Sequence, residues 1–264
     1  MTEIIGNPDG KTVISVITVC LNCVDSLPAT VESLHRQTWP WREWVVMDGG
    51  SKDGTQNLVS TGPERPTQFK SEPDKGIYDA MNKALALATG DVVYFLNADD
   101  ALYDEHVLAD VAREFDADPE LDFLFGSIVI RKPDKRIHKR YGYINRWTLP
   151  FEDLCHQAIF VRRSLFQRVG TFDLRWRTSA DYDWFLRVFA IGGKVKYIDR
   201  RVAYFAAGGF HAQQPNALAD ERRSLRLRYV SPLQLMVGSL ISRAAHKVSR
   251  LLRGGRRVGE SFDP

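Results

Sequence analysis

Residues 90–100, GDVVYFLNADD, join an uncharged apolar run to a polar end that carries two adjacent carboxylates. The run at residues 92–96 contains no charge, which is typical of a β-strand buried on both faces of a sheet. Such strands belong to parallel sheets that helices cover. Residues 97–100 follow at the carboxyl edge of the strand, where open α/β sheets bind their ligands. We therefore predict an α/β fold with a ligand site at this edge.

Strands and helices alternate through the first hundred residues. The segments VISVITV and EWVVM are apolar and rich in β-branched side chains, whereas the segments after Ser26 and Gly76 have apolar residues at helical spacing. The predicted elements are, in chain order, strand 13–19, helix 26–39, strands 43–47 and 68–71, and helix 77–88. This alternation predicts a Rossmann-like, mixed but mostly parallel sheet flanked by helices.

The second half shows a less regular pattern. We predict helix 104–115, strand 121–130, an exposed charged turn at 131–136, a loop over the sheet at 141–154, strand 157–161 and helix 181–191. The chain has no internal repeat and no low-complexity segment.

Carboxylates follow three of the predicted elements at the ligand edge. Asp99 and Asp100 suit a hard divalent cation, although acids after a strand also serve as helix caps. Asp48 opens the glycine-containing loop DGGS, which is either a ligand loop or a plain turn. Asp74 precedes a predicted helix start, which favours either an anion site or a simple cap. Because parallel strands end at one edge, we expect these acids to converge.

Four segments together resemble family 2 glycosyltransferases with the GT-A fold. They are SVITVCLN at 15–22, MDGGSKDGT at 47–55, EPDKGIYDAMNKALALATGD at 72–91 and FLNADD at 95–100, and the resemblance covers about the first 210 residues. It implies a nucleoside-diphosphate sugar donor and Mn²⁺ or Mg²⁺ as cofactor. It also implies donor contacts from Thr18, Asn22, Asp48, Asp74, Asn97 and Ala98, with Asp99 as metal ligand. Asn97 stands where the family has an acid, which leaves room for a weaker or water-mediated metal contact.

The acceptor side of the same resemblance lies in CHQA and TSADYDW. It implies Asp181 as the catalytic base, and Asp183 is the local competitor two residues along the predicted helix. His156 and Gln157 are candidates for acceptor or donor contact, with a satisfied buried histidine as the alternative for His156. His211 lies on a glycine-containing loop and is a second candidate for metal or diphosphate contact, or else it has no role in the site.

Composition fits one large domain with an appendage. The chain has 264 residues, of which 44% are apolar and 26% charged. No apolar stretch approaches eighteen residues and the first residues are polar, so we expect a cytoplasmic protein without a signal or membrane span. Cys20 and Cys23 form a CxxC without a second pair, and with Cys155 they are expected to be reduced thiols rather than zinc ligands or redox centres.

The net charge of +3 hides a basic tail. From Asp220 onward ten Lys and Arg stand against four acids, so the tail carries +6 and the remainder −3. Within 231–257 the apolar residues share one stripe and the basic residues lie off it, which predicts a basic amphipathic helix. Such a helix suits a peripheral contact with the inner face of the plasma membrane; packing on the domain or on a second subunit of a homodimer is the alternative. Nucleic acid is not expected, because the cations accompany an apolar stripe rather than a stacking surface.

The resemblance to family 2 glycosyltransferases implies a glycosyltransferase domain at 1–219, with a nucleotide-binding half at 1–100 and an acceptor half at 101–219, followed by the tail at 220–264. The predicted reaction is inverting transfer of a sugar to a hydroxyl of a glycan or lipid-linked acceptor. Two rivals stand beside it: a noncatalytic nucleotide-sugar-binding or scaffold protein, and a nucleotidyltransferase. The second would need a glycine- and Lys/Arg-rich loop after the first strand, where this chain has CLNCVDS.

Overall fold

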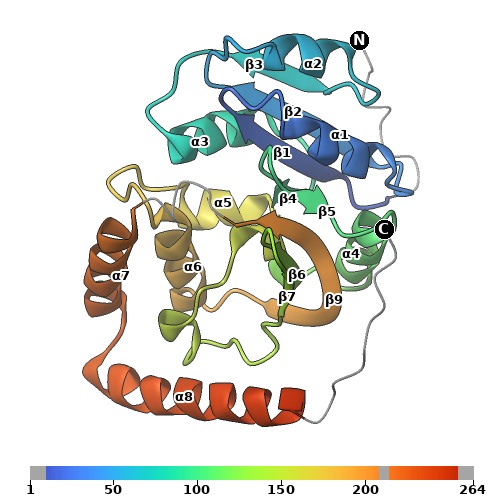
Figure 1. The fold of residues 1–264 in the computed structure, drawn as a ribbon. Coiled ribbons are helices and arrows are strands. Elements are labelled where there is room, and N and C mark those ends of the chain that lie inside the picture. Colours follow the sequence, from blue (N-terminus) through green and yellow to red (C-terminus); the bar gives the residue numbers. More distant parts are fainter. Residues whose placement is uncertain (1–9, 208–213, 255–264) are drawn as a thin grey trace.

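A computed structural model describes residues 10–207 and 214–254 (Figure 1). Its strands are β1 Ile14–Cys20, β2 Arg42–Asp48, β3 Gln68–Ser71, β4 Val92–Phe95, β5 Ala101–Leu102, β6 Phe123–Arg131, β7 Arg136–Lys139, β8 Ile159–Arg162 and β9 Val195–Ala206. Its helices are α1 Leu27–His35, α2 Thr55–Thr61, α3 Ile77–Leu87, α4 Val107–Ala117, α5 Ser164–Val169, α6 Ala180–Ala190, α7 Pro215–Tyr229 and α8 Pro232–Gly254, with 3₁₀ turns η1 Leu149–Phe151 and η2 His156–Ala158.

One sheet runs through the molecule in the order β3-β2-β1-β4-β8-β6-β9-β5, with β7 also paired to β6. The strands β3, β2, β1 and β4 are parallel to one another, as their alternation with helices predicts. Every residue of β1 is buried, which matches its uncharged sequence. The predicted α/β fold is confirmed in this half, and the four parallel strands end at one edge.

Beyond β4 the sheet becomes mixed. The strand β8 is antiparallel to both β4 and β6, whereas β6 and β9 are parallel. The twelve-residue β9 was not predicted, because its charged residues break the apolar pattern. Its pairing with β6 shifts register between Phe125 and Ser127, where a Cβ on Gly126 would lie 2.6 Å from the carbonyl oxygen of Arg200. In Figure 1, β9 is the long curved strand in the lower half of the sheet.

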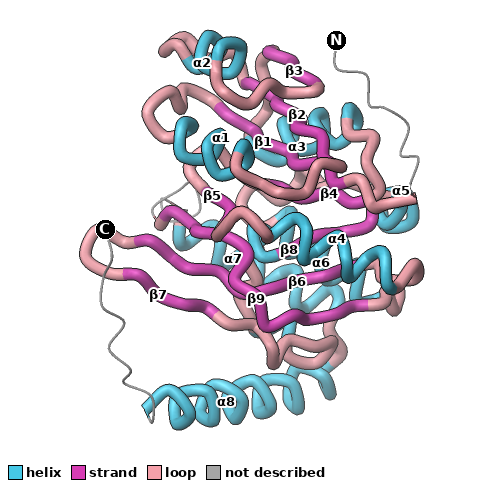
Figure 2. Tube along the Cα trace, turned by 90° about the vertical axis from the view of Figure 1, so that its right-hand side faces the viewer, coloured by secondary structure: helices cyan, strands magenta, loops and turns pink. Residues whose placement is uncertain are grey.

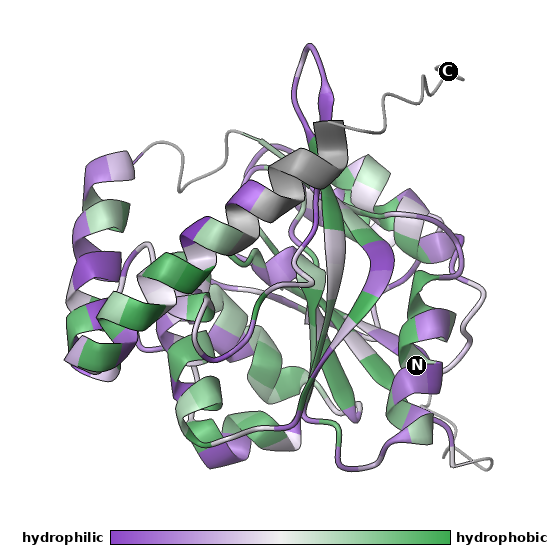
Figure 3. Ribbon diagram, turned by 90° about the horizontal axis from the view of Figure 1, so that it is seen from below, coloured by the Kyte–Doolittle hydropathy of each residue, from purple (hydrophilic) through white to green (hydrophobic). Residues whose placement is uncertain are grey.

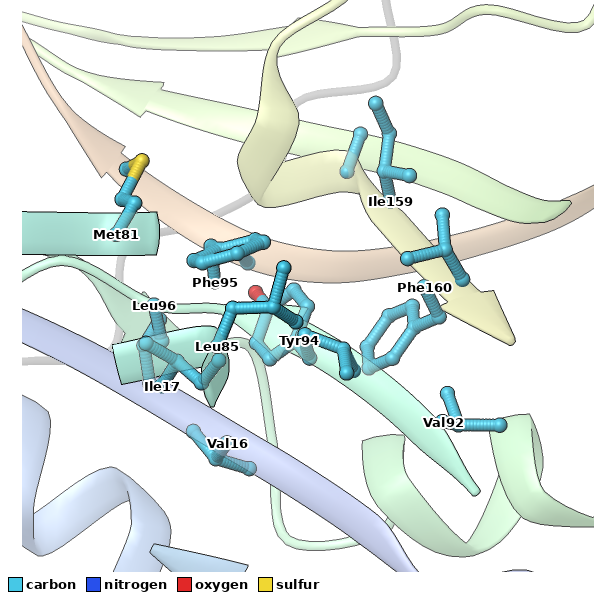
Figure 4. Close-up of a cluster of buried hydrophobic side chains, with 14 of the residues drawn as sticks. Val16, Ile17, Met81, Leu85, Val92, Tyr94, Phe95, Leu96, Ile159 and Phe160 are labelled. Carbon is cyan, nitrogen blue, oxygen red and sulfur yellow. The ribbon is translucent and has the colours of Figure 1, made fainter. Parts of the chain in front are cut away.

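Aromatic side chains fill the core where the two halves of the sheet meet. Figure 4 shows Tyr94 of β4 beside Phe160 of β8, and their rings stack with centroids 4.1 Å apart. On the next layer Trp184 of α6 stacks on Phe166 of α5 at 4.4 Å. Both pairs are buried, and burial of such rings stabilises the fold in proportion to the apolar area removed from water. This core holds α6 rigidly against the end of β4.

The turn into β4 depends on Gly90. Glu43, which is almost fully buried, accepts hydrogen bonds from the backbone N–H groups of Thr89 and Gly90 and from the hydroxyl of Ser15. A Cβ at position 90 would lie 2.6 Å from the Ser15 hydroxyl and 2.8 Å from the carbonyl oxygen of Val13. Only glycine leaves room for this network, which fixes the register of the strand that carries Asn97–Asp99.

Two helices follow β9 in the described chain: α7 beside α6, and α8 below the sheet (Figure 1). Figures 1 and 2 show α8 lying across the base of the molecule, at the end opposite β2 and β3. The helix packs closely on the 146–152 segment: a Cβ at Gly238 would lie 2.5 Å from the carbonyl oxygen of Trp147, and Ser242 donates to Glu152 at 2.6 Å. No helix of the described chain is both long and apolar enough to pass through a bilayer. The predicted boundary between residues 219 and 220 falls within α7.

Candidate active site

A cavity of about 940 Å³ opens at the carboxyl ends of β1 and β4. Eight of the predicted site residues line it: Asn22, Asp74, Asn97, Ala98, Asp99, His156, Gln157 and Asp181. Thr18 and Asp48 are fully buried beneath its wall. The hydroxyl of Thr18 accepts a hydrogen bond from the indole of Trp44 at 3.0 Å. His211 lies outside the described residues.

Asp48 organises the loop after β2. Its carboxylate accepts hydrogen bonds from the N–H groups of Gly50 at 3.1 Å and Ser51 at 2.9 Å, and from the hydroxyls of Ser51 and Ser71. Burial favours the neutral acid, but these hydrogen bonds outweigh it and lower the pKa of Asp48. Gly50 has a φ of 90°, which favours glycine. Asp48 therefore remains charged, and its hydrogen bonds to Gly50 and Ser51 hold the loop after β2 in its conformation.

Asp74 brings a second loop to the same edge. Its Oδ1 accepts from the N–H of Gly76 at 2.8 Å, at the start of α3. Its other oxygen lies against Gly49, where a Cβ would be only 2.5 Å away. Glycine at position 49 therefore permits the close approach of the β2 and α3 loops, and the predicted convergence of Asp48 and Asp74 is confirmed.

The two acids after β4 have different surroundings. Asp100 is fully buried and accepts from the Gln157 amide at 2.7 Å and from the Ala206 N–H at 2.9 Å. Burial, followed by the charge of Asp99, raises the pKa of Asp100 to about 7. Asp99 lines the cavity, and its own burial raises its pKa, although Arg131 opposes the shift. Asp99 is the member of the pair that faces the cavity.

Asp181 enters the cavity from the first turn of α6. Its carboxylate accepts from the Tyr78 hydroxyl and from the N–H of Tyr182, both at 2.8 Å. The ring nitrogen Nδ1 of His156 lies 3.4 Å from Asp181, and Nε2 lies 3.2 Å from the side-chain amide of Asn97. Asp181, His156 and Asn97 thus form a continuous row from α6 to the end of β4, which sequence spacing alone does not show.

Asp183 has a different environment from Asp181. It is buried, and its carboxylate accepts from Arg187 at 2.8 Å and from the Tyr229 hydroxyl at 3.1 Å. It does not line the cavity. Of the two adjacent acids, Asp181 is the one placed to meet a ligand, whereas Asp183 joins α6 to α7.

Several residues around the cavity have no counterpart in the sequence predictions. Tyr78 lies within a quoted motif, but nothing in its spacing indicates contact with Asp181. Lys139, Asp153 and Arg222 line the cavity: Lys139 follows the predicted turn at 131–136, Asp153 lies in the predicted loop and Arg222 in the predicted tail. Glu221 caps the segment before α6, since its carboxylate accepts from the N–H groups of residues 177 and 178 at 2.9 Å.

The end of β4 offers oxygen ligands for a cation. Asp99 supplies a carboxylate, and Asn97 Oδ1 is buried without a hydrogen-bond partner in the described chain. Both are the hard oxygen donors that Mg²⁺ and Mn²⁺ prefer. Within residues 10–207 and 214–254 no three His, Cys, Asp or Glu side chains gather in a metal-binding group.

The model of Glycosyl transferase family 2 matches residues 15–178. A PGL/p-HBAD biosynthesis glycosyltransferase of Mycobacterium bovis (strain BCG / Pasteur 1173P2) is 35% identical over 245 residues, which are 90% of this chain and 93% of the relative. An uncharacterized glycosyltransferase of Mycobacterium tuberculosis (strain ATCC 25618 / H37Rv) is 33% identical over 222 residues, with 82% and 85% covered.

Two solved structures share the fold. S. aureus TarS 1-349 in complex with UDP-GlcNAc superposes with a TM-score of 0.68 at 18% identity, over 87% of this chain and 70% of that one. The mannosyltransferase PcManGT from Pyrobaculum calidifontis, in complex with GDP-Man and Mn²⁺, gives 0.64 at 20% identity, over 94% and 80%. With its parallel strands β3, β2, β1 and β4 and acidic cavity edge, this chain belongs to glycosyl transferase family 2 and is a sugar-transferring enzyme of GT-A fold.

Proposed function

We propose that this enzyme transfers a sugar, with inversion, from a nucleoside-diphosphate sugar to a hydroxyl of a glycan or lipid-linked acceptor. One observation carries the proposal: Asp99 and Asp181, from separate halves of the chain, line one cavity. The donor side then comprises residues 1–100, with Asn22, Asp74 and Ala98 at its wall and Thr18 and Asp48 beneath it. The acceptor side comprises residues 101–219.

Asp181 is the proposed general base. Inversion requires a carboxylate that removes the proton from the acceptor hydroxyl as its oxygen attacks the anomeric carbon. The Asp181 carboxylate is held by Tyr78 and the backbone of Tyr182 and still borders the cavity. Burial and the negative charge of Asp181 raise the pKa of Tyr78 well above its usual value, so Tyr78 acts as a hydrogen-bond donor. His156 and Gln157 are proposed to border the acceptor hydroxyl or the donor sugar.

A divalent cation, Mn²⁺ or Mg²⁺, is the proposed cofactor. The carboxylate of Asp99 and the unpaired Oδ1 of Asn97 would hold it. When bound, the cation supplies Lewis-acid neutralisation of the departing diphosphate. The presence of Mn²⁺ with GDP-Man in the PcManGT complex supports this assignment.

The acceptor class is proposed from a relative. The mycobacterial glycosyltransferase that matches nine-tenths of this chain is named for PGL/p-HBAD biosynthesis. We therefore propose a role in cell-envelope glycolipid or polysaccharide assembly at the inner face of the plasma membrane. A carboxylate, Asp181, stands at the proposed position of the general base, and this favours an enzyme over a noncatalytic binding protein.

The test compares Asp181→Asn with Asp183→Asn. We expect Asp181→Asn to lower turnover by about 10²- to 10⁴-fold, the usual contribution of a general base, with nucleotide binding retained. Asp183→Asn is the matched control, because Asp183 faces Arg187 rather than the cavity. Turnover that survives Asp181→Asn would show that the base is assigned wrongly.

Donor binding is tested separately by thermal shift. The panel contains UDP-glucose, UDP-galactose, UDP-N-acetylglucosamine, GDP-fucose and dTDP-rhamnose, each with and without Mn²⁺. A ligand that binds only the folded state raises the melting temperature according to its concentration and affinity. We expect one nucleotide to stabilise the protein selectively, and more strongly with Mn²⁺. A panel without any shift would count against the whole assignment.

The helix α8 is the proposed membrane contact within the 231–257 tail. Leu233, Met236 and Leu240 are 62%, 61% and 60% exposed, and Arg243 and Lys247 are exposed beside them. Gly238 and Ser242 occupy the opposite face, against the domain. Figure 3, a view onto this helix, shows apolar and polar residues side by side along it. An outward apolar stripe with flanking cations suits an anionic lipid surface.

Vesicle sedimentation tests this contact. We expect the protein to bind vesicles with phosphatidylglycerol, to bind pure phosphatidylcholine less, and to lose binding when Met236 and Leu240 are changed to glutamate. Because both side chains point outward, the double variant should keep its fold and its nucleotide affinity. Unchanged vesicle binding, or a dimer that the double variant dissolves, would assign the stripe to another partner.

A further inference from the structure

Three cations gather at the part of the cavity contributed by residues beyond 130. Lys132 lies in the turn between β6 and β7, Lys139 ends β7, and Arg222 comes from α7. All three line the same cavity as Asp181. We name Lys132, Lys139 and Arg222 the cationic cluster. None of them belongs to the donor side at residues 1–100.

Two carboxylates face the cationic cluster: Asp153, which contacts it directly, and Asp181, whose negative charge also acts on Arg222. Lys139 donates to Asp153 at 3.0 Å, and Arg222 donates to the other oxygen of Asp153 at 2.7 Å. One carboxylate therefore serves two cations, and Lys132 adds a third positive charge at the exposed rim. The three cations outnumber these two carboxylates by one charge, which favours a further anion.

The side chain of Arg222 has one hydrogen-bond donor, Nε, without an acceptor in the described chain. This nitrogen is buried. The guanidinium is held in place by its contact with Asp153 and by the ring of Tyr182, which lies 5.2 Å beneath it. A buried N–H of a charged group that lacks an acceptor is costly, so a bound oxyanion would stabilise it.

Apolar residues border the same region. Ile130, Leu154, Phe205 and Leu218 line the cavity together with the cationic cluster. Such a combination suits an amphiphilic ligand whose anionic group meets the cations while its apolar chain covers the neighbouring surface.

We propose that the cationic cluster binds a phosphate group of an amphiphilic acceptor and thereby brings the acceptor hydroxyl to Asp181. This inference rests on the proposed function and names the acceptor as a phosphate-bearing lipid or lipid-linked sugar. The donor diphosphate is the other source of phosphate oxygen. Its proposed place is at Asp99 and Asn97 on the end of β4, whereas the cluster comes from β7, α7 and the turn before β7.

Isothermal titration with octyl phosphate tests the proposal. The wild-type protein is titrated with octyl phosphate, octanoate and octyl glucoside, each with and without saturating UDP and Mn²⁺. The variants are Arg222→Gln, Lys139→Gln and, as matched control, Arg223→Gln, whose side chain is exposed on the same helix. Melting temperatures verify that each variant is folded, and UDP affinity is measured for each.

We expect octyl phosphate to bind more tightly than octanoate or octyl glucoside. Arg222→Gln and Lys139→Gln should each weaken octyl phosphate by about tenfold, the effect of one lost charge-assisted hydrogen bond, whereas Arg223→Gln should have no effect. UDP affinity should be unchanged in all three variants. If Arg222→Gln fails to fold, Lys139→Gln alone decides the result.

Three outcomes would overturn the inference: equal binding of the three octyl compounds, octyl phosphate binding that neither Arg222→Gln nor Lys139→Gln weakens, or a loss of UDP affinity in these variants. The last would assign the cationic cluster to the donor diphosphate. A wild-type protein that binds octyl phosphate but no nucleotide would contradict the proposed function and leave the anion site standing, so the two failures are distinguishable.

Discussion

Asp100 makes the stability of this enzyme depend on pH in an unusual direction. Its carboxyl is fully buried beside Asp99, and its pKa rises from 3.8 to about 7 on folding. Between these values the unfolded chain has already lost the proton that the folded chain retains. Stability must therefore fall as the pH rises through this range, and the loss is complete only above pH 7.

The variant Asp100→Asn removes this linkage while preserving the shape of the side chain. The Asn oxygen can still accept from the Ala206 N–H, and Gln157 can turn its amide oxygen toward the new NH₂ group. Between pH 5 and pH 8 the wild type should lose about 2 to 3 kcal/mol of unfolding free energy relative to the variant, from the pKa difference of Asp100.

Urea unfolding at several pH values between 5 and 8 measures this difference. EDTA is present throughout, because a cation at Asp99 would itself change the protonation of the pair. The m-values of wild type and variant should agree, so that the midpoints report stability alone. A difference between the two proteins that stays constant across the pH range would refute the reasoning.

Three further predictions concern single residues. Gly90→Ala should cost about 1 to 3 kcal/mol of unfolding free energy, measured in urea, because its Cβ would meet the Ser15 hydroxyl; an unchanged midpoint would contradict this. Glu221→Gln should lower kcat by about tenfold with nucleotide affinity intact, because its carboxylate holds the segment before Asp181, the proposed base; equal loss of both would indicate general unfolding. Asn97→Asp should tighten Mn²⁺ binding in calorimetry with nucleotide present, by about tenfold, since it adds a charged oxygen ligand; weaker binding would exclude Asn97 from the metal site.

The first hundred residues of the fold could be predicted from the sequence because their signals are local. The β1 and β4 strands are short uncharged runs, β2 has the apolar centre WVVM, and α1 and α3 repeat their apolar residues at helical spacing. Parallel strands with helices between them end at one edge, so the meeting of the Asp48 and Asp74 loops follows from topology.

The elements after residue 100 could not be predicted to the same degree. The long β9 contains charged residues at several half-buried positions and shows no clean alternation. The helix α7 is polar over most of its length, and its Arg222 resembles any solvated tail residue in sequence. These elements are stabilised by contacts with segments far away in the chain, which no local pattern records.

The sequence by itself determined the family, the α/β class and eight of the residues that line the cavity. It also determined that α8 is amphipathic and basic. These conclusions depend on local residue types and on their spacing, and both can be read from short segments of the sequence.

Only the tertiary structure decided which of two neighbouring acids faces the cavity. Asp181 meets Tyr78 and His156 there, whereas Asp183 is held by Arg187 and Tyr229. It also decided that the apolar stripe of α8 faces outward and that Arg222 reaches the site. The direction in which a side chain points depends on how whole elements pack, and that packing is set by residues more than a hundred positions apart in the chain.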